Sequence, residues 1–139
     1  MRVIAEFELF EDEGFVLAFP FGMEGGTQGV DYADAVAMAC DWLLCAAEHA
    51  LMQGGEPPRP PLGNEPQRGG RVLAVCVDAD LSRVPSVSAT EAAERLGVSR
   101  PRVTQMVESG RLDGWREGRN ARVSLDSLNA RLAERGDVE

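Results

Sequence analysis

Polar side chains that could recognise DNA bases follow a serine in the last third of the sequence. Ser99 can cap the start of a helix, and Arg100, Arg102, Thr104 and Gln105 come soon after it. Arginine binds guanine bidentately and glutamine binds adenine, and the N-terminal part of a recognition helix is the part that enters the major groove. This spacing predicts a base-reading helix that begins at Ser99.

The surrounding residues have the pattern of a helix-turn-helix. Ser88 and Glu91 match a capping box for a first helix, and Gly97 can adopt the positive φ that the turn requires. Pro101 is tolerated in the first turn of the second helix, where backbone N–H groups have no partner in any case. The positions expected to face inward are Ala92, Ala93, Leu96, Val98, Val103 and Met106. The alternative interpretation is an ordinary helical hairpin with a solvated polar face.

A short basic hairpin is expected after the two helices. Residues 110–123 have the pattern of a strand, a Gly/Asn turn and a return strand, with Arg116, Arg119 and Arg122 expected at the tip. Such arginines can bind phosphates or enter the minor groove. A solvated hairpin is the alternative, because arginine is a common surface residue. Ser124 then caps a last helix, whose core-facing positions are Leu125, Leu128 and Leu132.

These motifs together resemble a known DNA-binding family. The runs S-A-T-E-A-A-E-R-L-G-V-S, S-G-R-L and G-R-N-A-R-V, followed by a leucine-bearing helix, resemble the excisionase-type winged helix-turn-helix, which is related to the MerR-type DNA-binding domain. The resemblance spans residues 86–135 and departs at Asn120-Ala121, where the family more often has a basic or aromatic residue. It implies a winged helix-turn-helix domain over residues 88–139.

The negative charge of the chain is concentrated in one half. Residues 1–80 contain 4 Arg and 14 Asp or Glu, a net charge of −10, whereas residues 81–139 contain 10 Arg and 9 acidic residues, a net charge of +1. Because DNA repels negative charge, the acidic half is expected to serve a different partner. We therefore expect an acidic domain over residues 1–80, a linker at 81–87 and a DNA-binding domain over 88–139.

The acidic half has the pattern of a small α+β domain with the element order β-β-β-α-β. Its first strand alternates between apolar positions and a wet face that includes Glu6 and Glu8. Further strands are expected at 15–19 and 71–78. The glycine-flanked residues 27–28 are expected to form either a short third strand or a close approach of two backbones.

One long helix is expected between the third and fourth strands. Asp31 can cap it and Gly54-Gly55 ends it. The helix positions expected to face the sheet are Ala33, Val36, Ala37, Cys40, Leu44, Ala47 and Leu51. The proline-rich residues 56–70 that follow are expected to form an extended and mobile loop or linker.

The acidic residues of this half could in principle bind a catalytic metal, as in a metal-dependent nuclease. A solvated face is the more common outcome for such residues, and no motif for a nucleophile or a phosphate-binding loop accompanies them. We therefore expect neither enzymatic activity nor a cofactor. The alternative, a weak RNase H-like hydrolase, would depend on Glu6 and Asp78. The acidic candidates are Glu6, Glu8, Glu11, Asp12, Glu13, Asp78 and Asp80.

The three cysteines and the single histidine do not form a metal-binding motif. Cys40, Cys45 and Cys76 include no C-x-x-C pair, and His49 has no second histidine, so zinc is not expected. Cysteines on apolar faces fit buried thiols in a reducing cytoplasm. The N-terminus lacks a secretory apolar segment, and no run approaches the roughly 18 apolar residues of a membrane span. A soluble cytoplasmic protein is therefore expected.

The N-terminal half resembles a second known family. The runs G-F-V-L-A-F-P and G-G-T-Q-G-V-D-Y-A-D-A-V-A-M-A, followed by a proline-rich connector and another strand, resemble the HicB-type antitoxin family over residues 2–80. The resemblance implies a partial RNase H-like fold without nuclease activity. It also implies a partner, a HicA-like toxin that is a small basic ribonuclease. The sequence departs from the family at residues 21–24, where an Asp-Leu-Pro-like turn is usual.

An acidic domain suits a basic RNA-cleaving partner, because opposite charges speed association. The candidates for toxin contact are Glu11, Asp12, Glu13 and Glu24. The resemblance further implies that the C-terminal domain represses the shared operon. Because operators usually consist of two half-sites, a homodimer or higher oligomer is expected. The sequence does not show which surface pairs: strand 71–78 and the 125–132 helix could contribute, but core positions are the more common role for such apolar residues. The alternative is a stand-alone dimeric transcription regulator whose N-terminal domain serves oligomerisation or ligand sensing.

Overall fold

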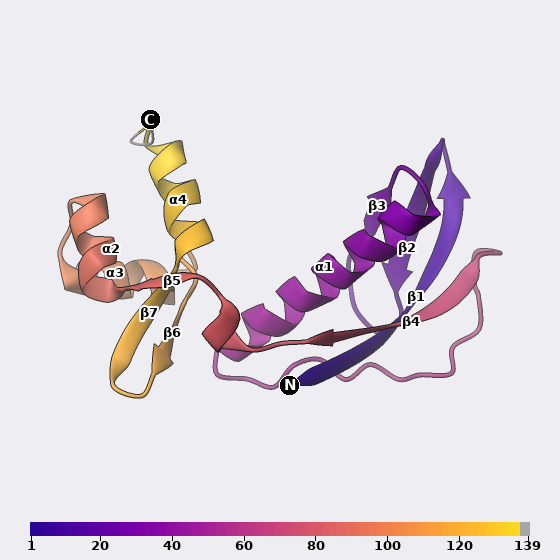
Figure 1. The fold of residues 1–139 in the computed structure, drawn as a ribbon, viewed down its shortest axis with the longest axis horizontal. Helices are drawn as coiled ribbons and strands as arrows, with labels where there is room; N and C mark the ends of the chain where they lie inside the picture. Colours follow the sequence, from indigo (N-terminus) through magenta and orange to yellow (C-terminus); the bar gives the residue numbers. More distant parts are fainter. Residues whose placement is uncertain (137–139) are drawn as a thin grey trace. The chain divides into compact units, whose positions relative to one another are not determined.

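The computed structural model describes residues 1–136, which divide into two compact units (Figure 1). The first unit consists of Met1–Leu51 with Gly55–Asp80, and the second of Met52–Gly54 with the chain from Leu81 onward. Each unit has its own cluster of buried apolar side chains. Each therefore has a core of its own.

A four-stranded antiparallel sheet and one helix build the first unit (Figure 1). The strands are β1 (Arg2–Asp12), β2 (Phe15–Pro20), β3 (Thr27–Gly29) and β4 (Arg71–Asp78), and α1 (Tyr32–Met52) follows β3 in the chain. Their order in the sheet is β3-β2-β1-β4. The element order β-β-β-α-β predicted from the sequence is confirmed.

One face of β1 and one stripe of α1 meet in the core of this unit. Val3, Ala5, Phe7 and Leu9 are nearly fully buried, as the alternation of side chains along a strand predicts. The buried helix positions are Ala35, Ala39, Leu43 and Ala47.

This stripe corrects the predicted one, of which only Ala47 is fully buried. The helix is apolar on several sides, so the 3–4 spacing of apolar residues does not select a single face. The selected face carries small residues that let the backbone of β3 approach closely. A Cβ atom on Gly29 would lie 2.3 Å from the Ala35 nitrogen, so glycine is required there.

By length and composition alone, α1 is apolar enough to cross a membrane. The sequence analysis expected no uninterrupted run of about 18 apolar residues, and α1 contains none, because Asp34, Asp41 and Glu48 interrupt it. The Ala35–Ala47 stripe is nevertheless packed into the core with the sheet. The core therefore accounts for the apolar residues of this stripe.

The face of β1 that was expected to be wet is instead covered by the proline-rich segment. Glu8 is only 2% exposed. Its carboxylate accepts hydrogen bonds from the backbone N–H groups of Gln67 (2.8 Å), Arg68 (2.7 Å) and Gly70 (3.0 Å). Burial raises the pKa of Glu8, but these three hydrogen bonds and the Arg68 charge outweigh it, so the pKa lies below its ordinary value.

Further contacts hold the same segment on the sheet. Glu6 accepts hydrogen bonds from the backbone N–H (2.9 Å) and the side-chain amide (2.8 Å) of Asn64, which lower the pKa of Glu6. The Arg68 guanidinium lies 5.5 Å from the ring centroid of Phe10 and 4.7 Å from that of Phe19. Residues 56–70 contain neither helix nor strand, as predicted for an extended loop. The expected mobility is wrong for residues 64–70, because carboxylates and aromatic rings bind them to the sheet.

The second unit combines four helical segments with a three-stranded sheet of order β5-β7-β6. Ser86–Ser88 (β5) pairs with β7, so the predicted linker 81–87 contains the start of a strand as well as a short 3-10 helix. A three-residue strand gives no alternation signal, which is why the sequence did not reveal it. The bounds are η1 Leu81–Arg83, β5 Ser86–Ser88, α2 Ala89–Leu96, α3 Arg100–Glu108, β6 Gly114–Glu117, β7 Asn120–Ser124 and α4 Leu125–Glu134.

The cysteines are not the buried thiols that the sequence predicted. Cys45 and Cys76 are exposed and Cys40 is half-buried. Cys40 and Cys45 belong to α1, whose most buried stripe passes through neighbouring positions, and Cys76 belongs to β4, an edge strand. Cys45 is exposed because it lies outside the buried stripe of α1, and Cys76 is exposed because β4 has a neighbouring strand on one side only.

Candidate DNA interface and acidic cleft

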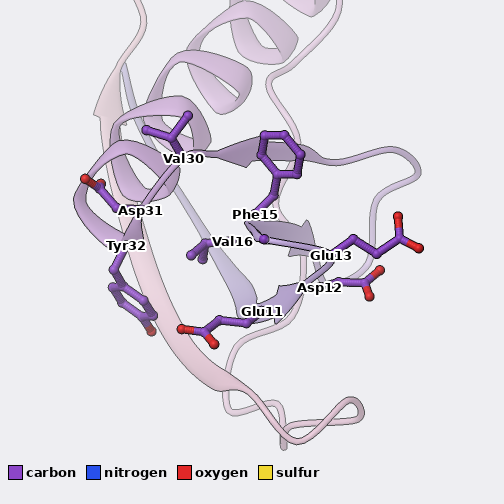
Figure 2. A pocket seen from close by; sticks show the side chains of 9 residues that line it. Glu11, Asp12, Glu13, Phe15, Val16, Val30, Asp31 and Tyr32 are labelled. Carbon is purple, nitrogen blue, oxygen red and sulfur yellow. The ribbon is translucent and has the colours of Figure 1, made fainter.

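The hairpin between β1 and β2 forms one wall of an acidic cleft in the first unit (Figure 2). Glu13 and Gly14 form its two-residue turn with φ values of 51° and 85°, the positive values that a tight hairpin requires. Glu11 and Asp12 end β1 at the same place, so three carboxylates lie at one end of the sheet. The cleft has a volume of about 530 Å³.

Large apolar side chains open into this cleft next to the carboxylates. Phe15 is 42% exposed, Val30 71% and Tyr32 37%. In Figure 2 the Glu11 carboxylate extends in the direction of Tyr32, whereas Asp12 and Glu13 extend away from it. An apolar surface rimmed by carboxylates is suited to an arginine or lysine side chain, because it receives both the methylene stem and the charge.

The structure does not bring all predicted toxin-contact residues together. Glu24 lies in the connection between β2 and β3, beyond Pro20, whereas Glu11, Asp12 and Glu13 lie at the Phe15 end of β2. Phe15, Val30, Asp31 and Tyr32 were missed as members of the cleft. These residues belong to the cleft because Val16 of β2 pairs with Gly29 of β3. That register is known only from the structure.

The carboxylates considered for metal binding do not converge. Glu6 is opposite Ala74 in the β1–β4 ladder, and Asp78 is opposite Arg2, four residues further along. Within the described residues 1–136, no group of three or more His, Cys, Asp or Glu side chains is arranged to hold a metal ion. Glu6 and Glu8 instead bind backbone and amide N–H groups of the 64–70 segment.

Local capping builds the first candidate DNA element, the α2–α3 pair. The Ser88 hydroxyl accepts a hydrogen bond from the Glu91 N–H at the start of α2 (3.1 Å). Gly97 ends α2 with φ 69° and ψ 33°, and the Val98 N–H then bonds to the Ala93 carbonyl (3.0 Å). These local bonds set the turn between the two helices.

The second helix is placed by its cap and by its buried side. The Ser99 hydroxyl accepts a hydrogen bond from the Arg102 N–H (3.3 Å), and Pro101 lies in the first turn. Val103 and Met106 are buried with α2, β7 and α4 residues. The four predicted base-reading positions are all exposed: Arg100, Arg102, Thr104 and Gln105.

Two of these side chains lie next to one another on the exposed side of α3. The Arg102 Nη1 atom is 3.5 Å from Gln105 Oε1, so the pair presents guanidinium and amide groups together. Thr104 donates its hydroxyl to the Arg100 carbonyl (3.4 Å). Ion pairs in this unit join Arg95 with Glu91 and Arg131 with Glu134. Within the described residues, neither α3 arginine forms an ion pair with a carboxylate.

The β6–β7 hairpin forms the predicted wing, but its arginines divide into two kinds. Arg116 and Arg119 are exposed at the tip, where the Arg116 guanidinium lies 3.5 Å from the Arg119 carbonyl. Arg122 lies opposite Trp115, away from the tip, and donates to the hydroxyl and the carbonyl of Ser86, both at 3.0 Å. The expectation that Arg122 lies at the tip is wrong, because its side chain forms hydrogen bonds that connect β7 to β5.

Comparison with known proteins agrees with this geometry. The family model of the helix-turn-helix domain matches residues 87–136. The C-terminal unit is a helix-turn-helix domain. The chain is also 40% identical over 60 residues to a Mycobacterium tuberculosis protein named "Putative antitoxin VapB50", a match that covers 41% of this chain and 46% of that protein. The matched part is thus about half of that relative. No solved structure matches the chain.

The sequence prediction of the helix-turn-helix domain is confirmed, and its exposed face can now be described residue by residue. Arg102 and Gln105 are adjacent on α3, and Arg116 and Arg119 lie at the tip of the wing. DNA contact by these residues stays a prediction.

Proposed function

We propose that this protein is an antitoxin that represses its own operon through the helix-turn-helix domain. The observation that carries the DNA-binding part is the capped helix α3, which presents Arg102 and Gln105 side by side on its exposed face. A bidentate arginine and a bidentate amide are the groups that distinguish guanine and adenine in the major groove. The exposed arginines of the wing would add contacts to phosphates.

The first unit is proposed to bind and neutralise a small basic toxin of the HicA type that cleaves mRNA. Support comes from the resemblance of residues 2–80 to HicB-type antitoxins, from the β-β-β-α-β order and from the net charge of −10. The curated relative carries the VapB name, so the HicB-type assignment and its partial RNase H-like fold rest on the motif resemblance. The acidic cleft supplies a surface suited to cationic side chains.

We propose no enzymatic activity for this unit and a cytoplasmic location. Glu6 and Glu8 hold the 64–70 segment, and Asp78 binds the N-terminal ammonium group, so these carboxylates have structural partners. Operator DNA and messenger RNA are both reached in the bacterial cytoplasm. A repressor of that DNA and a neutraliser of a toxin that cleaves that RNA would act in the same compartment.

Co-expression with a small basic protein, where one is encoded beside this gene, tests the proposal, and the absence of such a neighbour would favour a stand-alone regulator. We expect a stable complex that relieves the toxicity of the neighbour. A triple variant Glu11→Gln, Asp12→Asn, Glu13→Gln should weaken the complex by about tenfold, because the cleft loses its charge complementarity to a basic partner. Glu24 lies outside the cleft, so Glu24→Gln should change the affinity little. A protein that purifies alone but still binds its promoter would instead be a stand-alone dimeric transcription regulator, and the antitoxin proposal would fail.

A further inference from the structure

The two edges of the first unit's sheet differ in how open they are to another strand. At one edge, β3 has only three residues and includes Gly29. At the other edge, β4 has eight residues and reads R-V-L-A-V-C-V-D. Edge strands are usually protected by short length, charge, proline or a bulge, because they can pair with another chain. The six residues between Arg71 and Asp78 contain neither charge nor proline.

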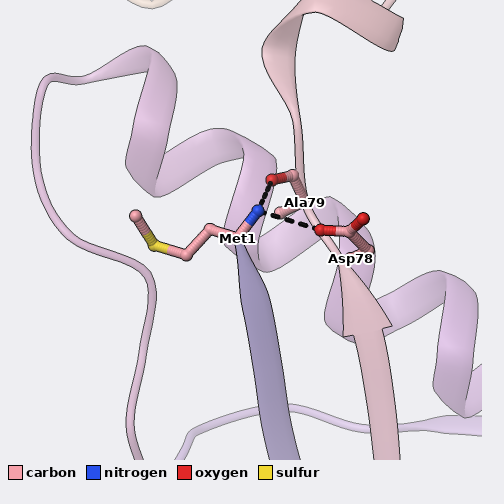
Figure 3. Close-up of polar contacts among 3 residues, drawn as sticks. All are labelled: Met1, Asp78 and Ala79. Atoms are coloured by element: carbon pink, nitrogen blue, oxygen red, sulfur yellow. Dashed lines mark hydrogen bonds and ion pairs between the residues drawn. The ribbon is translucent and has the colours of Figure 1, made fainter.

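The hydrogen-bond pattern shows which backbone groups of β4 point outward. The Met1 ammonium donates to the Ala79 carbonyl (2.7 Å) and to Asp78 (2.9 Å), and the Ala79 N–H donates to the Met1 carbonyl (2.8 Å), which joins the ends of β1 and β4 (Figure 3). In an antiparallel ladder, hydrogen-bonded pairs recur at every second residue. Val77, Val75 and Leu73 therefore bond to β1.

The intervening residues of β4 turn their N–H and C=O groups away from β1. They are Val72, Ala74 and Cys76, and the side chains of Ala74 and Cys76 are exposed. This strand therefore presents outward-facing backbone donors and acceptors along residues 72–76. That segment is about as long as a typical β-strand, so it is long enough to pair with another strand.

Apolar side chains are exposed around the start of β1, the strand that pairs with β4. Ile4 is opposite Cys76 in the ladder and is 39% exposed, and Leu62, which lines the same depression as Ile4, is 55% exposed. All large exposed apolar side chains of the described residues belong to residues 1–62. Leu125, Leu128 and Leu132, the other dimerisation candidates, belong to the core of the helix-turn-helix domain. An apolar self-association surface must therefore be sought in the first unit.

We propose that β4 pairs antiparallel with β4 of a second copy of this chain, so that one sheet continues through both protomers. A strand that pairs antiparallel with itself is self-complementary about a two-fold axis, which is the symmetry of most dimers. Charge favours the same location. Two bodies with a charge of −10 each can approach most easily along an uncharged strip, and residues 72–77 supply one.

A dimer of this kind would also complete the proposed DNA site. One recognition helix contacts one half-site, and two-fold protein symmetry matches a palindromic operator. This consequence rests on the proposed function, whereas the pairing itself rests on the β4 edge. The two can be tested separately, because the mass of the protein in solution does not depend on DNA.

The mass of the full chain, measured by light scattering during size exclusion, tests the pairing. We expect twice the chain mass of 15.0 kDa for the natural protein. Ala74→Pro should give a monomer, because proline removes an outward N–H and leaves the β1–β4 bonds in place. Ala74→Val keeps that N–H and should remain a dimer. A monomeric natural protein, or a folded Ala74→Pro dimer, would overturn the proposal.

Cross-linking gives a second measurement that does not depend on how the proline variant folds. With Cys40 and Cys45 replaced by serine, Cys76 of two copies should be joined by a short bis-maleimide, because antiparallel pairing brings the two strands together. A chain that retains Cys45 alone, which is also exposed but lies on α1, should not be joined. Absence of a Cys76 cross-link in a dimeric protein would place the interface elsewhere and refute β4 pairing.

DNA binding separates failure of this inference from failure of the proposed function. The folded Ala74→Pro monomer should still bind a single half-site as the natural protein does, but should lose cooperative binding to the two-half-site operator. If neither protein binds DNA, the proposed repressor function fails, while the mass and cross-linking still decide the pairing. If a dimer forms and cooperativity is unchanged in the proline variant, the β4 pairing is wrong.

Discussion

The two units divide their charged side chains in the same way, although the charges have opposite sign. In the first unit, Glu8 is buried against backbone N–H groups, whereas Glu11 to Glu13 are exposed at the hairpin. In the second, Arg122 is bonded to Ser86, whereas Arg116 and Arg119 are exposed at the wing tip. Residues of the same type and only a few positions apart thus differ in role. Their hydrogen-bond partners, rather than their charge, distinguish structural residues from available ones.

The largest effect that would test this division is the loss of Glu8. Glu8→Ala leaves three backbone N–H groups without their carboxylate partner, so we expect the free energy of unfolding to fall by about 3 kcal/mol. Glu11→Ala, an exposed carboxylate three residues away, should change it by less than about 0.5 kcal/mol. Urea unfolding of both variants provides the measurement. Equal effects would show that the two carboxylates do not differ in role.

The next effect concerns the exposed face of α3. Arg102→Ala or Gln105→Ala should each weaken operator binding by about 1–3 kcal/mol and relax base preference at one position, because each loses a base contact. Arg95→Ala, on α2 and paired with Glu91, is the matched control and should leave the preference unchanged. Gel shifts with the operator and with single-base variants measure this. Unchanged binding by both α3 variants would contradict their assignment as base-reading residues.

A smaller effect is expected at the wing. Arg119→Ala should weaken binding to all DNA sequences alike and reduce the slope of log affinity against log salt by about one, because a phosphate contact is lost. Arg122→Ala should act first on stability, because it removes two hydrogen bonds to Ser86. Salt titrations and thermal unfolding of both variants separate these outcomes. A stability loss at Arg119 with none at Arg122 would reverse the roles given to them.

The smallest effect is a pH dependence of the 64–70 segment. The pKa values of Glu6 and Glu8 lie below the ordinary value of 4.5 in the folded protein. Their stabilisation is therefore fully present above about pH 4.5 and is lost as the pH falls through the lower, folded-state values. Amide hydrogen exchange at Gln67, Arg68 and Gly70 should accelerate in that acidic range. Exchange that is independent of pH, after correction for its intrinsic rate, would show that the carboxylates do not hold the segment.

Elements defined by short-range signals were predicted well from the sequence. The α2–α3 pair depends on Ser88, Gly97 and Ser99, each of which acts on backbone groups within four residues. The strand alternation of β1 likewise predicted an apolar face, and the structure buries that face through Val3, Ala5, Phe7 and Leu9. Such signals are local, so a single sequence is enough to identify them.

Features that depend on distant partners were not predictable. Glu8 was expected in water because nothing near it indicates a bond to residues 67–70, about 60 positions away. Arg122 meets Ser86 across 36 positions. The acidic cleft needs the β2–β3 register to bring Val30 and Tyr32 next to the Glu11–Glu13 hairpin. Each of these contacts depends on how the chain folds over long distances in the sequence. The conformational preferences of neighbouring residues do not determine it.

The sequence by itself determined the β-β-β-α-β order of the first unit, the helix-turn-helix with its caps, and the separation of negative from positive charge along the chain. Only the tertiary structure decided which face of α1 is buried, which carboxylates and arginines keep an open surface, and which edge of the sheet remains unpaired. The physical reason is that caps and periodicity act within a few residues. Burial and hydrogen-bond satisfaction depend on what the fold places opposite each side chain.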